Sequence, residues 1–141
     1  MIVLDVNILI AGFREDHPHH ARARPWLLDS LASGAAIGVP DIVWVGFLRL
    51  CSNPRVFPVA STIEEALDVV RALTAAPGYV HLGGLRDDIE PFLQTVVSAN
   101  AAGNLTTDAY IATMALSIAA EVATFDRDFR RFDGLRIIEP A

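Results

Sequence analysis

Two short apolar segments near opposite ends of the chain each run directly into an aspartate. Residues 2–4 precede Asp5, and residues 122–125 precede Asp126. A third acid, Asp108, stands at the start of an expected helix that is apolar on almost all sides. In open α/β sheets, ligands bind where strands end and helices begin. The pattern therefore predicts that three acids far apart in sequence meet at one edge of a sheet.

Strand and helix patterns alternate along the chain. Short apolar runs bounded by Gly, Pro or an acid predict strands, and apolar residues three or four positions apart predict helices. The expected strands are residues 2–4, 36–39, 79–82, 122–125 and 135–138, and the expected helices lie near 6–12, 19–31, 41–50, 63–70, 89–97 and 108–120. Alternation of this kind predicts an α/β protein: a three-layer α/β/α domain with a central parallel sheet of about five strands, occupying residues 1–141.

The charged residues exclude several chemistries. All 11 basic residues are arginine, and the net charge of −6 argues against broad, nonspecific binding to polyanions. A phosphate loop of the Walker type and a Schiff-base enzyme both need a lysine, which this chain lacks. An enzyme that uses Asp5 as a phosphoryl-accepting nucleophile is an alternative that the missing lysine disfavours, because the haloacid-dehalogenase phosphatases rely on one.

The single cysteine and the hydropathy pattern indicate the cellular compartment of the protein. Cys51 has no partner for an internal disulfide, which favours a reducing compartment. The longest apolar stretch, residues 109–120, falls short of the roughly 20 residues that a membrane span needs. We therefore expect a cytoplasmic protein without membrane contact.

Each of the three acids also has a purely structural explanation. Asp5 can cap the helix that follows it, and Asp126 can cap the turn after it. Asp108 favours the helix dipole, with Thr106 or Thr107 as the cap, as Asp41 is expected to cap its own helix. Converging carboxylates repel one another unless a cation holds them, and Mg²⁺ prefers oxygen ligands. The presence of all three acids at sheet-end positions therefore favours a Mg²⁺ or Mn²⁺ site, in which the cation activates water for attack on a phosphodiester.

Three segments resemble, in order, the acidic motifs of PIN-domain nucleases. They are LDVNIL at residues 4–9, TDAYIA at 107–112 and ATFDRDF at 123–129. The chain's length is similar to that of VapC-type ribonuclease toxins of bacterial toxin–antitoxin pairs. The resemblance implies an RNA-cleaving enzyme that forms a homodimer and is neutralised by a small VapB-like antitoxin. It implies that the metal ligands are Asp5, Asp108 and Asp126, and that the residues orienting them or their waters are Asn7, Thr124 and Asp128.

One position departs from the family pattern. Where most PIN domains carry a glutamate about two turns into the helix after Pro40, this chain has Gly46. A glycine inside a helix costs roughly 1 kcal/mol relative to alanine, so we expect close packing or a backbone approach there. The alternative function is a weakly active or inactive PIN fold that binds RNA or its antitoxin.

Two groups of polar residues have less specific interpretations. Arg49, Arg127 and Arg130 are candidates for RNA phosphate contacts, with ordinary surface ion pairs as the alternative. The three histidines of residues 16–20 lack the spacing of a zinc site. We expect them on the surface, with contact to RNA or a partner protein as the alternative.

Overall fold

The computed structural model describes residues 1–86 and 88–141. Its sheet has five parallel strands in the order β3-β2-β1-β4-β5. The strands are β1 (Ile2–Leu4), β2 (Ile37–Val39), β3 (Tyr79–His81), β4 (Glu121–Ala123) and β5 (Arg136–Ile138). The chain adds strands on one side of β1, then returns to place β4 on the other side. The strand order therefore reverses between β1 and β4, where open α/β sheets bind their ligands.

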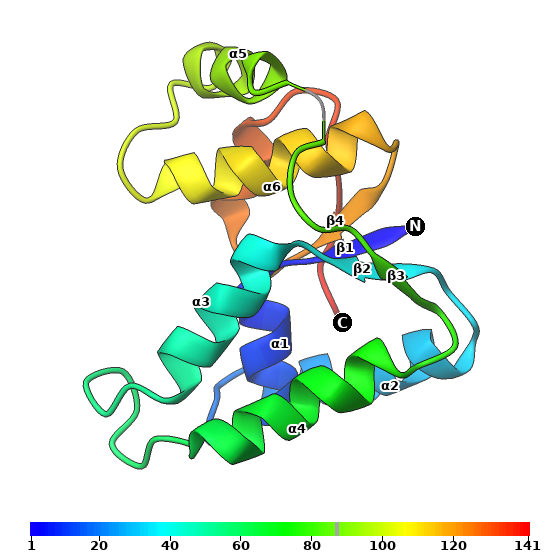
Figure 1. Ribbon diagram of the computed structural model, residues 1–141, viewed down its shortest axis with the longest axis vertical. Helices are drawn as coiled ribbons and strands as arrows, with labels where there is room; N and C mark the ends of the chain where they lie inside the picture. The colour runs from blue at the N-terminus through cyan, green and yellow to red at the C-terminus, as the bar shows by residue number, and fades with distance from the viewer. Residues whose placement is uncertain (87) are drawn as a thin grey trace.

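Helices cover both faces of this sheet. Figure 1 shows α5 and α6 on one face and α1, α2, α3 and α4 on the other, which confirms the predicted three-layer α/β/α fold. The helices are α1 (Val6–Phe13), α2 (His20–Ala32), α3 (Asp41–Cys51), α4 (Ile63–Thr74), α5 (Glu90–Ser98), α6 (Leu105–Ser117) and the 3-10 helix η1 (Arg127–Arg131). No helix within residues 1–86 and 88–141 has both the length and the apolar character to cross a membrane.

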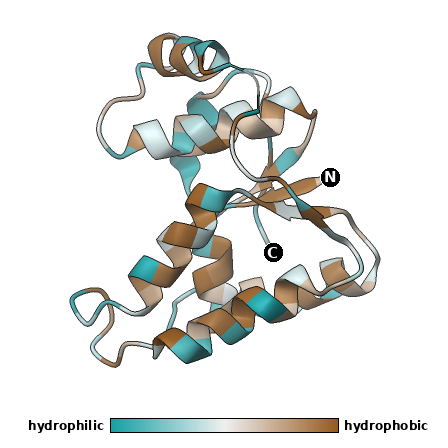
Figure 2. Ribbon diagram, in the orientation of Figure 1, coloured by the Kyte–Doolittle hydropathy of each residue, from teal (hydrophilic) through white to brown (hydrophobic). Residues whose placement is uncertain are grey.

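The central strands and α1 form the core that supports the sheet edge. Val3, Leu4 and Val122 are fully buried between the helical layers, and β1 is brown in the hydropathy colouring of Figure 2. In β2, a side-chain carbon at Gly38 would lie 2.5 Å from Leu82, so only glycine lets the loop after β3 pack against this strand. Burial on both faces explains why the strands carry continuous apolar runs rather than alternation.

Some predicted boundaries and caps are wrong by a few residues. Asp41 is the first residue of α3 rather than its cap, because Pro40 holds the extended conformation of the N-cap position. Helix α6 begins at Leu105 after Asn104, so neither Thr106 nor Thr107 caps it. Strand β4 ends at Ala123 instead of continuing to residue 125. These differences leave the three acids where strands end and helices begin.

Candidate active site

Asp5 lies at the end of β1 with both carboxylate oxygens hydrogen-bonded. It is the N-cap of α1, and its Oδ1 accepts from the backbone N–H of Val6 at 2.7 Å. Its Oδ2 accepts from Asn7 Nδ2 and from Thr124 Oγ1, each at 2.7 Å. Only 4% of the Asp5 surface is exposed. The capping interpretation is therefore correct for Asp5, but a cap alone does not require the two additional side-chain donors.

Thr124 and Asn7 join the end of β1 to the end of β4. Thr124 Oγ1 accepts from Asn7 Nδ2 and from the backbone N–H of Asp126, each at 3.0 Å. Asn7 Oδ1 accepts from the backbone N–H of Phe125 at 3.2 Å. These bonds fix the Asp5 carboxylate relative to the backbone that carries Asp126. Asn7 and Thr124 therefore orient the Asp5 side chain.

Asp126 lies between β4 and η1. Its Oδ1 accepts from the backbone N–H of Asp128 at 2.8 Å, which makes it the N-cap of the 3-10 helix. The Asp128 side chain is exposed and lies 3.9 Å from the Arg131 guanidinium. Asp128 therefore supports Asp126 through its backbone, while its carboxylate faces solvent.

Asp108 reaches the same region from α6. Together with Asp5 it lines a pocket of about 310 Å³ between α3, α1 and α6. Two other residues singled out in the sequence, Gly46 and Arg49, line this pocket as well. The remaining lining residues are mostly apolar: Val6, Ile42, Val43, Val45, Leu50, Thr107 and Ile111.

Burial and mutual repulsion disfavour the charged forms of two of these acids. Burial raises the pKa of Asp5 from its ordinary value of 3.8 to about 6, against the hydrogen bonds from Thr124 and Val6, which lower it. Burial raises the pKa of Asp108 to about 7, and the charges of Asp5, Asp126 and Asp128 add to this rise. These three acids are therefore close enough to Asp108 to repel its charge. An arrangement of this kind stores electrostatic free energy that a bound cation would release.

The donor set suits a hard divalent cation, although the acids are not gathered at ligand distance. Within the described ranges, no three His, Cys, Asp or Glu side chains lie close enough together to hold a metal ion. Carboxylate oxygens in a buried, repulsive group are nevertheless the chemistry that Mg²⁺ or Mn²⁺ requires, and Mg²⁺ keeps several of its own waters. Asp5, Asp108 and Asp126 therefore suit such a cation by the chemistry of their donor atoms.

Comparison with known proteins establishes the family. A sequence model described as the PIN domain matches residues 2–135. The chain belongs to the PIN-domain family. Ribonuclease VapC31 of Mycobacterium tuberculosis is 38% identical over 140 residues, covering 99% of both chains. Ribonuclease VapC25 of the same species is 36% identical with the same coverage.

Solved structures share the fold of this PIN domain. VapBC2 from Rickettsia felis, bound to a DNA fragment from its promoter, aligns with a TM-score of 0.74 and 18% identity over 100% of both chains. VapC20 of Mycobacterium tuberculosis, described as a sarcin-ricin loop cleaving toxin, aligns with a TM-score of 0.64 and 16% identity, covering 96% of this chain and 99% of its own.

Packing does not explain the glycine at position 46 of this PIN domain. A side-chain carbon there would meet only Val6 Cγ2, at the ordinary contact distance of 3.6 Å. The expectation of close packing is therefore wrong. Gly46 leaves open space in the wall of the pocket that holds Asp5 and Asp108.

The candidate arginines divide between two cavities of the PIN domain. Arg49 lines the pocket of Asp5 and Asp108, whereas Arg127 and Arg130 line a separate cavity of about 160 Å³ at the end of β4. That second cavity also contains Phe125 and Glu139, which the sequence did not single out. Only their position after β4 and β5, at the edge where the acids lie, could have drawn attention to them.

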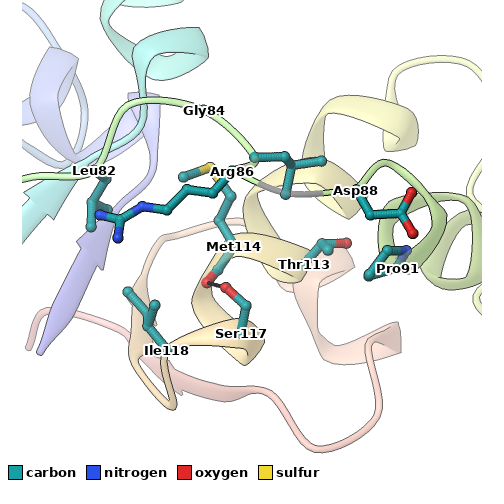
Figure 3. A pocket seen from close by; sticks show the side chains of 10 residues that line it. Leu82, Gly84, Arg86, Asp88, Pro91, Thr113, Met114, Ser117 and Ile118 are labelled. Carbon is teal, nitrogen blue, oxygen red and sulfur yellow. Dashed lines mark hydrogen bonds between the residues drawn. The ribbon is translucent and has the colours of Figure 1, made fainter.

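A further cavity lies apart from the acids. It measures about 350 Å³ and separates α6 from the loop after β3 (Figure 3). Arg86 and Asp88 of the loop lie along it, opposite Thr113 of α6. Ser117 Oγ donates to the Met114 carbonyl at 2.7 Å, so this hydroxyl is already satisfied. The described lining contains none of the three acids, and the cavity is not the candidate active site.

Proposed function

We propose that this protein is an endoribonuclease toxin that needs Mg²⁺ or Mn²⁺ and is neutralised by a small VapB-like antitoxin. The observation that carries the proposal is that Thr124 joins the Asp5 carboxylate to the backbone N–H of Asp126 where the strand order reverses. Asp108 is near enough to have its pKa raised by the other acids. Full-length relatives at 38% and 36% identity are named ribonucleases, which supports RNA as the substrate.

In the proposed reaction, the side chains of this protein bind the cation and the RNA phosphate and orient Asp5. Asp5, Asp108 and Asp126 would supply carboxylate oxygens for the cation, and the Thr124 and Asn7 side chains hold Asp5 in one orientation. A divalent cation held there would favour loss of a proton from a water molecule, so that hydroxide is available to attack a phosphodiester, and would offset charge on the phosphate. Arg49, exposed on α3 at the same pocket, offers a guanidinium to a phosphate oxygen.

Incubation of the purified, antitoxin-free protein with total RNA and with transfer RNA tests the function. We expect discrete cleavage products when Mg²⁺ or Mn²⁺ is present and none when a chelator is added. RNA binding without cleavage under all metal conditions would contradict the enzyme and support the alternative of an RNA-binding PIN fold. Release of phosphate from a small monoester would instead support the phosphatase alternative.

Metal binding should stabilise the protein more at higher pH. The folded-state pKa values of Asp5 and Asp108, about 6 and about 7, lie above their unfolded value of 3.8. The contribution of the protonated side chains to the free energy of unfolding is therefore fully present below pH 3.8. It is lost as the pH rises through 6 and 7, because the folded protein must then hold the charged forms. We expect Mn²⁺ to raise the Tm clearly at about pH 8 and little at about pH 5, where protons compete with the cation. Equal shifts at both values would contradict the site.

A glutamate in place of Gly46 should strengthen the site. The space beside Val6 accepts a side chain, and α3 directs it into the pocket of Asp5 and Asp108. We expect Gly46→Glu to lower the metal concentration needed for half-maximal cleavage, whereas Gly46→Ala should only raise stability by roughly 1 kcal/mol. Titration of Mn²⁺ against cleavage rate measures the first effect and thermal unfolding the second. If both variants behave alike in the titration, the missing acid does not limit activity.

Exposed apolar residues support a homodimer. Helix α5 has no buried residue, and Ile89, Leu93 and Val97 lie exposed at intervals of four. On α3, Val45 is 64% exposed. Such surfaces usually contact another protein. We expect light scattering to give twice the chain mass, and Leu93→Glu with Val97→Glu to give the monomer mass. A parent protein that is already monomeric would contradict the dimer.

A further inference from the structure

The cavity of about 160 Å³ at the end of β4 borders the acids directly. It is lined by Phe125 and Asp126 from the segment after β4, by Arg127 and Arg130 from η1, and by Glu139 after β5. Because Asp126 also belongs to the acid group, a ligand in this cavity would lie beside a molecule held at the active site. The segment after β4 is mostly teal in Figure 2, in keeping with its charged side chains.

Two arginines from different elements converge on the Glu139 carboxylate: Arg130 lines the cavity, and Arg22 reaches Glu139 from α2. Arg22 Nη2 on α2 donates to Glu139 Oε1 at 3.2 Å, and Arg130 Nη2 on η1 lies 4.0 Å from Glu139 Oε2. Arg127 lines the same cavity as Arg130 and Glu139, in a chain whose net charge is −6. Glu139 is 39% exposed and Arg130 is 67% exposed, so these ion pairs exchange readily with ligands from solvent.

An aromatic stack holds Arg22 in place. The Phe125 ring stacks on the His19 imidazole, with centroids 4.2 Å apart and an interplanar angle of 20°. The Arg22 guanidinium lies 5.0 Å from the centroid of the same ring. The backbone N–H of Phe125 is bound by Asn7, which also binds Asp5. Arg22 is therefore positioned by the same network that orients the acids, with less freedom to lose on binding an anion.

We propose that this cavity is a phosphate subsite for the RNA strand, in which a backbone phosphate takes the place of the Glu139 carboxylate between Arg22 and Arg130. Guanidinium groups bind phosphate and carboxylate in the same forked geometry. Glu139 thus acts as an internal competitor that fills the subsite when no RNA is bound. The inference rests on the proposed ribonuclease function, because RNA is the phosphate-bearing substrate.

Binding of a fluorescein-labelled single-stranded RNA, followed by anisotropy in the presence of a chelator, tests the subsite without cleavage. We expect Arg22→Gln and Arg130→Gln each to weaken binding about fivefold and to reduce the slope of log affinity against log salt by about 0.7. Glu139→Gln should strengthen binding about threefold, because it removes the competing charge. Arg71→Gln and Glu64→Gln on α4 change the net charge equally at exposed positions and serve as matched controls.

The possible results test the subsite and the ribonuclease function separately. Weaker binding by both arginine variants with stronger binding by Glu139→Gln, each relative to its control, supports the subsite. If Glu139→Gln binds no better than Glu64→Gln and lowers the Tm, the arginines only anchor the end of the chain and the proposal is overturned. If the parent protein cleaves RNA while all variants bind like the controls, the subsite is wrong and the ribonuclease function stands. A parent protein that neither binds nor cleaves RNA contradicts the function itself.

Discussion

Replacement of Asp108 by asparagine is expected to abolish cleavage while making the metal-free protein more stable. The variant keeps the size of the side chain but removes one of the charges available to the cation, and losses of a single preorganised charged or polar group typically cost about 10²–10³ in rate. Burial and its acidic neighbours also raise the pKa of Asp108 to about 7, above the value of about 6 for Asp5. At about pH 8 the variant should unfold about 3 °C higher than the parent, the shift that roughly 1 kcal/mol produces in a chain of this size.

The pH dependence of that difference provides the internal check. At about pH 5 the parent's Asp108 is already protonated, so asparagine should bring almost no gain there. Asp133→Asn, at an exposed position, is the matched control and should change neither cleavage nor Tm. Thermal unfolding at both pH values, with cleavage measured in Mn²⁺, covers both parts. An Asp108→Asn variant that still cleaves RNA would remove Asp108 from the mechanism, and loss of cleavage with no gain at high pH would contradict the repulsion.

Replacement of Thr124 by valine should cost the most stability and loosen the site at the same time. Its hydroxyl donates to Asp5 Oδ2 and accepts from Asn7 and from the backbone N–H of Asp126. Valine fills the same space but removes one hydrogen-bond partner from each of these three polar groups, while Asp5 and Asn7 keep the bond to each other. We expect a loss of about 2–3 kcal/mol, seen as a fall in Tm of about 8 °C. Loss of a group that orients a ligand also weakens metal affinity by roughly 10–100-fold.

Thr113→Val is the control that distinguishes the effect of losing the Thr124 hydrogen-bond network from the effect of losing any buried hydroxyl. Thr113 is 4% exposed, and its Oγ1 donates only to the Ala109 carbonyl, at 2.7 Å within α6. That carbonyl keeps its helical partner in the variant, so the expected loss is about 1 kcal/mol and Mn²⁺ should still raise the Tm as in the parent. Equal losses in the two variants, with metal-induced stabilisation intact in both, would mean that Thr124 does not orient Asp5.

Local patterns predicted most of the fold and the neighbourhood of the acids. Continuous apolar runs such as residues 2–4 and the helical spacing around Ala66 are properties of short segments. Their strand and helix character can therefore be predicted from neighbouring residues alone. The wrong predictions concern the ends of helices and strands. Thr106, for example, was a candidate cap, but Gly103 adopts a φ of +61° and the helix starts two residues after it. Such ends depend on backbone geometry that composition does not specify.

Residue types and their local spacing were enough to predict the parallel α/β architecture, to exclude lysine-dependent chemistry and to place the acids at strand and helix ends. The contacts of those acids depend on how distant elements pack. Thr124 and Asp5 are 119 positions apart, and the bond between their side chains exists because the strand order places β4 beside β1. The open space at Gly46 and the convergence of two arginines on Glu139 likewise depend on packing between distant elements. Contacts of this kind follow from the sheet order and side-chain directions, which no local segment encodes.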